Sequence, residues 1–418
     1  MGLRIRAVRP PRAAALVLAA VLTPSASAQL LNRATWLGSE EEGFRRDYRQ
    51  DAEYFIDRAG YVDLPPWWRE DGAGGPLDPF ASRVSIAAGS VSSDDLTLET
   101  TTQLALALGK GATFRAQHLS TENQTTRFQR FGIGLDVAVT DETALFAQLE
   151  GGGDKERADL SLGAEFFRTE RSAHRLMLTL VDFSDGKTDV FEYASSAYGL
   201  MLSGFTGAAD EVQFVYDVSA QLPFEERELA TGTLFEMERA IGLAELRIPI
   251  GARDRWIVAF DGELTSKENR PLDRFDPERE DGDVTRARLR TEWWRRSENG
   301  YDTTLGFWLH HLDEDYVRPN DLRQSRRVRR REAILTGRMR VPLSDSWTLE
   351  PYLFTGYVDL EDATGGIDAD LDFGSFQGKI GAPILFRFSD AAFLRLDLSF
   401  QLDEFAFGGG GMQLQASF

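Results

Sequence analysis

The 418-residue chain contains no cysteine, which excludes disulfide bonds, thiolate metal sites and a lipid attached to an N-terminal cysteine. Long hydrophobic runs are also missing, because no segment after residue 28 approaches the roughly 18 consecutive apolar residues of a membrane-spanning helix. This absence excludes a helical inner-membrane protein. Positive charge is in deficit: 47 Lys and Arg face 67 Asp and Glu, for a net charge of -20. Nucleic acid is therefore not expected as a partner.

The first 28 residues have the three parts of a secretory signal peptide. Four arginines precede the apolar run 13–22, and the small residues Ala26, Ser27 and Ala28 follow it as an A-x-A cleavage site. The apolar run is too short to cross a bilayer. We therefore expect cleavage after Ala28 and export of the remainder, with an uncleaved N-terminal anchor as the alternative.

After residue 80 the chain becomes a series of segments in which apolar residues alternate with charged, amide or small ones. Residues 131–139 and 394–402 show the pattern most clearly, and residues 96–108 and 158–166 repeat it. A period of two is the signature of β-strands. A soluble β-sandwich of this size would need a large apolar core between two sheets. The charged face of these segments is too consistently charged to be buried in such a core.

The connections between these segments alternate between short turns and longer acidic loops. Short turns are expected near residues 109–111, 140–142, 169–171, 207–209, 251–253, 297–299, 342–346 and 389–390, and the largest loops at about 266–283, 313–327 and 360–370. Short turns at one end and long loops at the other are typical of transmembrane barrels, with the turns in the periplasm. Residues 81–418 then hold about 18 strands, with 16 as the alternative.

Aromatic residues near the short turns predict an interfacial girdle, formed by Phe205, Trp256, Tyr301, Trp347, Phe386, Phe388 and Phe393. The last segment, 412–418, alternates and ends on Phe418. In this the chain resembles bacterial outer-membrane porins and related barrels. The resemblance implies an all-β, transmembrane, antiparallel up-and-down β-barrel in the Gram-negative outer membrane. Its partners would be membrane lipid, lipopolysaccharide and, during biogenesis, the barrel-assembly machinery.

Residues 29–80 differ in character from the rest. A capping box at 39–42 and apolar residues at helical spacing up to Gly60 predict an amphipathic helix, followed by a linker. The helix could plug the lumen or lie at the periplasmic mouth, where it could bind a periplasmic partner.

If the apolar alternate positions of each strand face lipid, the polar alternate positions face the lumen. The expected channel-lining residues are Arg286, Arg288, Arg290, Arg330, Arg338, Arg340, Lys379, Arg387, Arg395, Glu245, Asp261, Glu263 and Trp308. One hypothesis is that a basic wall faces an acidic wall and creates a transverse field. The alternative is an interior of ion pairs, with Glu292, Glu332 and Glu350 neutralising neighbouring arginines.

The function that best fits these features is an outer-membrane channel or porin for small polar or anionic solutes. A barrel that exports an exopolysaccharide with periplasmic partners is the first alternative, and an outer-membrane enzyme or scaffold the second. We expect no enzyme activity, because the four histidines show no complete catalytic constellation. No cofactor or metal is expected either, since the acidic run 368–372 does not match the EF-hand spacing.

Overall fold

The computed structural model describes residues 83–417 apart from 91–95, 110, 123–126, 153–154, 170, 181–190, 194–197, 209, 278, 323–324, 365–370, 390–391 and 403–406. The signal peptide predicted at 1–28 and the helix and linker predicted at 29–80 lie outside the described residues. Both therefore stay predictions. The acidic run 368–372, which was compared with a calcium-binding loop, also lies partly outside, because residues 368–370 are not described.

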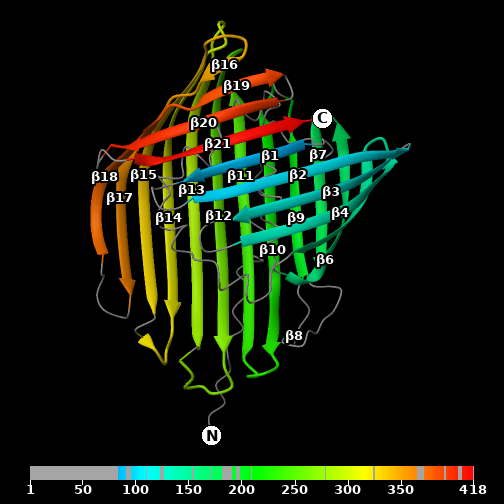
Figure 1. Ribbon diagram of the computed structural model, residues 1–418, viewed down its shortest axis with the longest axis vertical. Helices are drawn as coiled ribbons and strands as arrows, with labels where there is room; N and C mark the ends of the chain where they lie inside the picture. Colours follow the sequence, from blue (N-terminus) through cyan, green and yellow to red (C-terminus); the bar gives the residue numbers. More distant parts are fainter. Residues whose placement is uncertain are drawn as a thin grey trace.

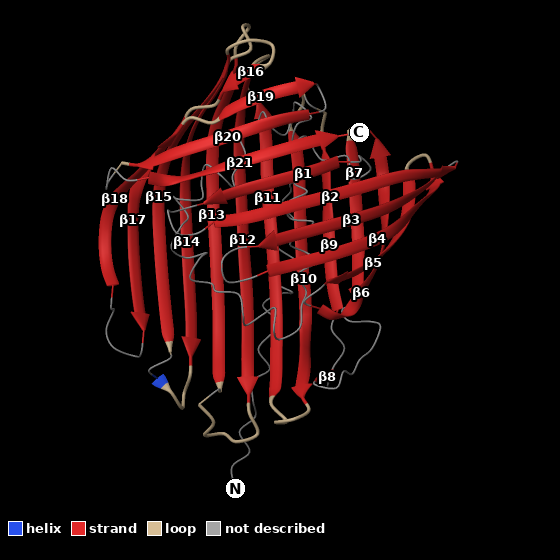
Figure 2. Cartoon of the chain, viewed as in Figure 1, coloured by secondary structure: helices blue, strands red, loops and turns tan. Residues whose placement is uncertain are grey.

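The described chain is one sheet of antiparallel strands that closes on itself (Figures 1 and 2). The strands are β1 (Arg83–Ser90), β2 (Leu96–Gly109), β3 (Ala112–Glu122), β4 (Arg127–Thr140), β5 (Thr143–Gly152), β6 (Lys155–Thr169), β7 (Ser172–Leu180), β8 (Phe191–Tyr193), β9 (Tyr198–Thr206), β10 (Gln213–Glu228), β11 (Leu234–Pro249), β12 (Asp254–Arg270), β13 (Glu280–Arg296), β14 (Asp302–Val317), β15 (Arg326–Pro342), β16 (Trp347–Leu349), β17 (Tyr352–Thr364), β18 (Leu371–Gly381), β19 (Ile384–Ser389), β20 (Ala392–Gln401) and β21 (Phe407–Ser417). The first strand pairs with both β2 and β21, which closes the barrel. No helix among these residues is long and apolar enough to cross a membrane.

Three pairs of strand segments each make a single crossing of the barrel. The segments β8 and β9 lie along the same edge of β10, β16 and β17 both pair with β15, and β18 and β19 both pair with β20. Pro351 separates β16 from β17 and Pro383 separates β18 from β19, because proline has no N–H to donate to the ladder. The described segments therefore make about 18 crossings, as the alternation predicted.

Every short turn expected from the sequence joins two strands at one end of the barrel. Gly207 shows why glycine is needed there: its φ is +91°, and a Cβ would lie 2.1 Å from the Val212 carbonyl oxygen. The loops at the opposite end are shorter than expected. Strand pairing continues to Arg270 and resumes at Glu280, because oppositely charged side chains across neighbouring strands allow the ladder to extend past the apolar zone.

The two faces of the strands differ in the way the sequence alternation predicted. The outer face exposes a belt of large apolar residues, including Leu335 (59% exposed) and Leu305 (54%), whereas the alternate residues point into the barrel and are largely buried. Such a belt around a closed barrel is stable only against acyl chains. The chain is an outer-membrane β-barrel.

The structure corrects the predicted aromatic girdle at two of its residues. Trp256, Trp347 and Phe388 are exposed on the outer face near the short turns, and Tyr301 is exposed in its turn. Two other members point inward: Phe393 is buried and shares the inner face with its register partner Gln415, and Phe205 pairs with Val215, an inward residue of β10, and with Ala173 of β7. Phe393 lies two residues from the inward Arg395 on the same strand, so the sequence alternation already indicated that it points inward.

Candidate functional site: the lumenal arginine ladder

Six arginines form an ordered series on the inner face of β13 and β15, with β14 between them. Strand register places Arg286 and Arg330 on one rung with Leu312, and Arg290 on the rung of Trp308. Further toward the short turns, Arg338 pairs with Thr304 and Arg340 with Asp302. We call this series the arginine ladder; its members are Arg286, Arg288, Arg290, Arg330, Arg338 and Arg340.

Each rung of β13 faces carboxylates on the neighbouring strand β12 or on β11. The Arg288 Nε lies 2.8 Å from an Asp261 carboxylate oxygen, and Arg286 lies 3.7 Å from Glu263. Arg290 lies 3.9 Å from both Glu245 and Asp261. Arg290, Glu245 and Glu263 are buried, and a buried charge requires such a partner.

The rungs on β15 are paired in the same manner. Arg330 forms an ion pair with Glu332 and Arg338 with Glu292, while Arg340 lies 3.4 Å from Asp302. The glutamates that were expected to neutralise their arginine neighbours therefore do so, including Glu350, which lies 3.5 Å from Arg395.

Basic and acidic residues are interleaved in the lumen, so the hypothesis of two facing walls needs correction. The acids Glu245, Asp261 and Glu263 lie on β11 and β12, beside the arginines of β13 and not across from them. Basic groups are nevertheless in excess on the ladder strands. Inward positions of β13 and β15 carry Arg286, Arg288, Arg290, Arg296, Arg326, Arg330, Arg338 and Arg340 against Glu280, Glu292 and Glu332.

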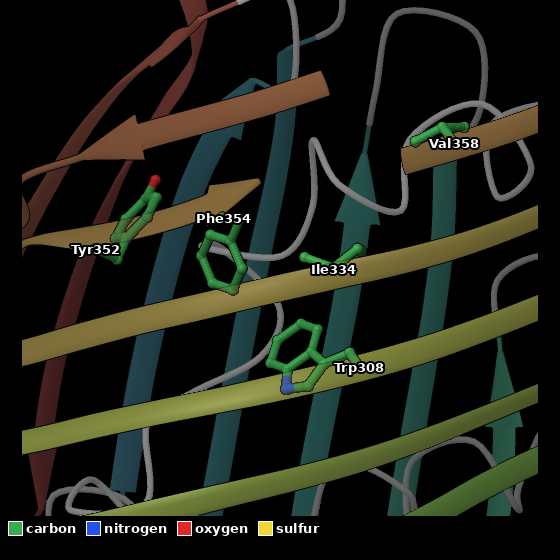
Figure 3. Close-up of a cluster of buried hydrophobic side chains, with 5 residues drawn as sticks. All are labelled: Trp308, Ile334, Tyr352, Phe354 and Val358. Carbon is green, nitrogen blue, oxygen red and sulfur yellow. The ribbon is translucent and has the colours of Figure 1, made fainter. Parts of the chain in front are cut away.

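Trp308 lies on the rung of Arg290 and is fully buried. It packs with Ile334, Tyr352, Phe354 and Val358, which belong to β15 and β17 (Figure 3). Its ring centroid lies 5.3 Å from that of Phe354. The ring thus joins the charged inner face of β13 to an apolar patch on β15 and β17.

Three arginines surround the Trp308 ring. The guanidinium carbons of Arg288, Arg290 and Arg338 lie 5.8, 6.0 and 5.4 Å from the ring centroid, within the range of cation–π attraction. The indole N–H donates to a Glu292 carboxylate oxygen at 2.9 Å. Glu292 therefore holds both Trp308 and Arg338 in place.

Replacing Glu292 by alanine is expected to destabilise the barrel by about 3–5 kcal/mol, because it removes the carboxylate that pairs with the buried Arg338 and accepts from the Trp308 N–H. Urea unfolding in lipid vesicles, followed by the heat-modifiable electrophoretic mobility, measures this loss. Glu298→Ala is the matched control, since the Glu298–Arg253 pair is exposed and is worth less than about 1 kcal/mol. Equal effects of the two variants would contradict the role of Glu292.

At the short-turn end, two parts of the wall meet across the lumen. Ile257 of β12, Trp294 of β13, Leu385 of β19 and Phe393 of β20 form one buried cluster, which we call the apolar clasp. Between β13 and β19 lie β14, β15 and the β16–β17 crossing, so the contact joins strands that are not neighbours. In Figure 1, β19 and β20 pass in front of β12 and β13 near the top of the view.

Charged residues surround the clasp. The guanidinium carbons of Arg255 and Arg296 lie 5.1 and 5.3 Å from the Trp294 ring centroid. The indole N–H of Trp294 donates to Asp302 at 3.1 Å, and Arg296 also pairs with Asp302 at 3.0 Å. The short-turn end of the lumen is therefore narrowed by an apolar contact with arginines beside it.

The remaining expected lining residues also point inward. Lys379 and Arg395 are buried, and Arg387 is the register partner of the inward Phe393. Their role in lining a channel stays a prediction. Sequence reasoning placed Trp308 in the lumen but missed the apolar residues packed around it and those of the clasp, for which the only signal was their parity with the lumenal charges.

No protein-family model and no curated protein matches the chain. Solved structures that resemble it include a loop-deletion mutant of OmpT, an outer membrane protein of Vibrio cholerae, at 10% identity over 81% of this chain and 97% of that chain, with a TM-score of 0.42. OprD of Pseudomonas aeruginosa matches at 11% identity over 81% and 94%, with a TM-score of 0.37. A bacterial polysaccharide outer membrane secretin matches at 10% identity over 81% and 99%, with a TM-score of 0.35.

These similarities are too low to carry an argument about function. They do require one correction: the prediction that the chain is not an enzyme is withdrawn. Two structures of OmpT match, with TM-scores of 0.42 and 0.39, and at about 10% identity they support the barrel fold alone. They do not show an enzyme, and they leave no ground for excluding one.

Proposed function

We propose that this barrel is an outer-membrane channel for small anionic solutes, in which the arginine ladder lines the route and the apolar clasp is its narrow point. The observation that carries the proposal is the series of cationic groups along the ladder strands. Guanidinium groups lie on five of the six inward rungs between Leu312 and Asp302 of β14, and the rung of Gly306 is the exception. A solute anion can therefore pass from one cationic group to the next.

The ion pairs within the ladder are compatible with transport. Conduction requires that binding be favourable enough for entry and weak enough for release, and carboxylates beside each guanidinium weaken its hold on a passing anion. The apolar clasp supplies the second element of the proposal, because a hydrophobic constriction gates by excluding water. Separation of β12 and β13 from β19 and β20 opens the route.

Reconstitution of the purified protein into planar lipid bilayers tests this function. We expect discrete conductance steps and, under a KCl gradient, a reversal potential on the anion-selective side, because arginines exceed carboxylates on the ladder strands. A folded protein that gives no conductance, or one that prefers potassium, contradicts the proposal. The export alternative stays a prediction; co-purification of a periplasmic complex through residues 29–80 tests it.

A further inference from the structure

The outer face of the ladder strands changes from apolar to charged at one level. Leu289, Leu309, Ala333 and Tyr357 are register partners across β13, β14, β15 and β17, and the three large side chains are exposed. The next outward rung toward the loops holds Ala287, His311, Arg331 and Asp359 in the same order. The polar boundary of the membrane therefore lies between these two rungs.

Beyond this boundary, three arginines occupy successive outward positions of β15. Arg327, Arg329 and Arg331 alternate with inward residues, so neighbouring members lie about 7 Å apart along the strand. Each points away from the lumen and toward the surroundings of the barrel. We call this series the outer arginine column.

Carboxylates on both sides contact the column without burying it. The Arg327 guanidinium lies 2.6 Å from Asp315, and Arg329 lies 3.6 Å from Asp313 and 3.5 Å from Glu361. The side chains of Arg327 and Arg331 are 50% and 58% exposed. Exposed pairs of this kind are weak, and each guanidinium has five N–H donors. A stronger acceptor can therefore compete for the column.

The position of the column identifies the groups that it meets. It lies at the loop end, which faces the cell exterior when the short turns are periplasmic. The head groups there belong to the outer leaflet, whose glycolipid carries phosphates on its sugars.

We propose that the outer arginine column binds the phosphate groups of lipopolysaccharide at the outer face of β14, β15 and β17. Guanidinium groups match phosphate oxygens with paired, charge-assisted hydrogen bonds. The flanking carboxylates keep the patch close to neutral overall. Recognition therefore depends on direct contacts between guanidinium and phosphate, and a general attraction to anionic surfaces contributes little.

Native mass spectrometry of the full chain in detergent, titrated with bisphosphorylated lipid A, tests the proposal. We expect the variant carrying Arg327→Gln, Arg329→Gln and Arg331→Gln to bind lipid A about tenfold more weakly than the unmodified protein. Lipid A stripped of both phosphates should bind the two proteins equally weakly. Retained heat-modifiable mobility shows that the variant is folded.

A matched control removes the same charge elsewhere. Arg171, Arg253 and Arg295 have exposed side chains at the short-turn end, and their replacement by glutamine should leave lipid A binding unchanged. An equal loss in this control would show that only net charge matters. That result, unchanged binding by the column variant, or equal binding of phosphate-free lipid A by the unmodified protein would each overturn the proposal. None of these measurements depends on whether the barrel conducts.

Discussion

Replacement of Arg286, Arg288 and Arg290 by glutamine is expected to convert the barrel from anion to cation selectivity. These side chains occupy successive inward positions of β13, and their partners Glu245, Asp261 and Glu263 remain when the arginines are removed. A unit charge about 7 Å from a passing ion contributes about 2 kcal/mol at an effective dielectric constant of 20. The permeability ratio of chloride to potassium should therefore fall by about tenfold or more. The reversal potential in a planar bilayer measures this ratio.

A charge-compensated variant is the control for this prediction. Adding Glu245→Gln, Asp261→Asn and Glu263→Gln to the three arginine substitutions removes both halves of the ion pairs, which restores the net charge of the inner wall. It also takes one carboxylate each from the buried Arg239 and Arg247, which pair with Glu263 and Glu245, so retained heat-modifiable mobility must first show that the variant is folded. Selectivity should return toward that of the unmodified protein. If the arginine variant kept its preference for anions, the ladder would not line the route.

Cross-linking of the apolar clasp is expected to abolish conductance reversibly. The chain has no cysteine, so Ile257→Cys and Leu385→Cys introduce the only thiols, on opposite parts of the wall that meet in the clasp. A reducible bis-maleimide should join them in the folded barrel. Because parting of the clasp opens the proposed route, the joined protein should give no conductance steps until the linker is reduced.

The control pair combines Ile257→Cys with Phe386→Cys. Phe386 is adjacent to Leu385 but lies against Trp347, which is exposed on the outer surface. The barrel wall separates the two thiols of this pair, so no intramolecular link should form. Mass spectrometry of linked peptides distinguishes the two cases. Failure of the clasp pair to link would contradict the contact itself, whereas linkage without loss of current would contradict only its role as the narrow point.

Local pattern was sufficient for much of this architecture. Strand parity depends only on whether successive residues suit lipid or water, so the alternation at 131–139 and 394–402 correctly placed the apolar side chains outside. The turn positions were also readable from short runs of residues, as at Gly207. The lumenal side of Arg286, Arg288, Arg290 and Trp308 followed from the same parity.

Other features depend on residues that are distant in the sequence. Nothing near Phe393 or Trp294 indicates that they meet across the lumen, because the contact joins strands that are not neighbours in the closed sheet. The length of the charged strand extensions also escaped prediction. Asp313 and Asp315 look like loop residues until Arg327 and Arg329 of the neighbouring strand are placed beside them.

The sequence by itself therefore determined the barrel, the positions of its short turns and the inward side of its charged residues. The tertiary structure alone decided which of those residues meet: the pairing of each arginine with its carboxylate, the ring of guanidinium groups around Trp308 and the closure at the clasp. The physical reason is that alternation is a property of each strand, whereas register and curvature are set by the whole closed sheet.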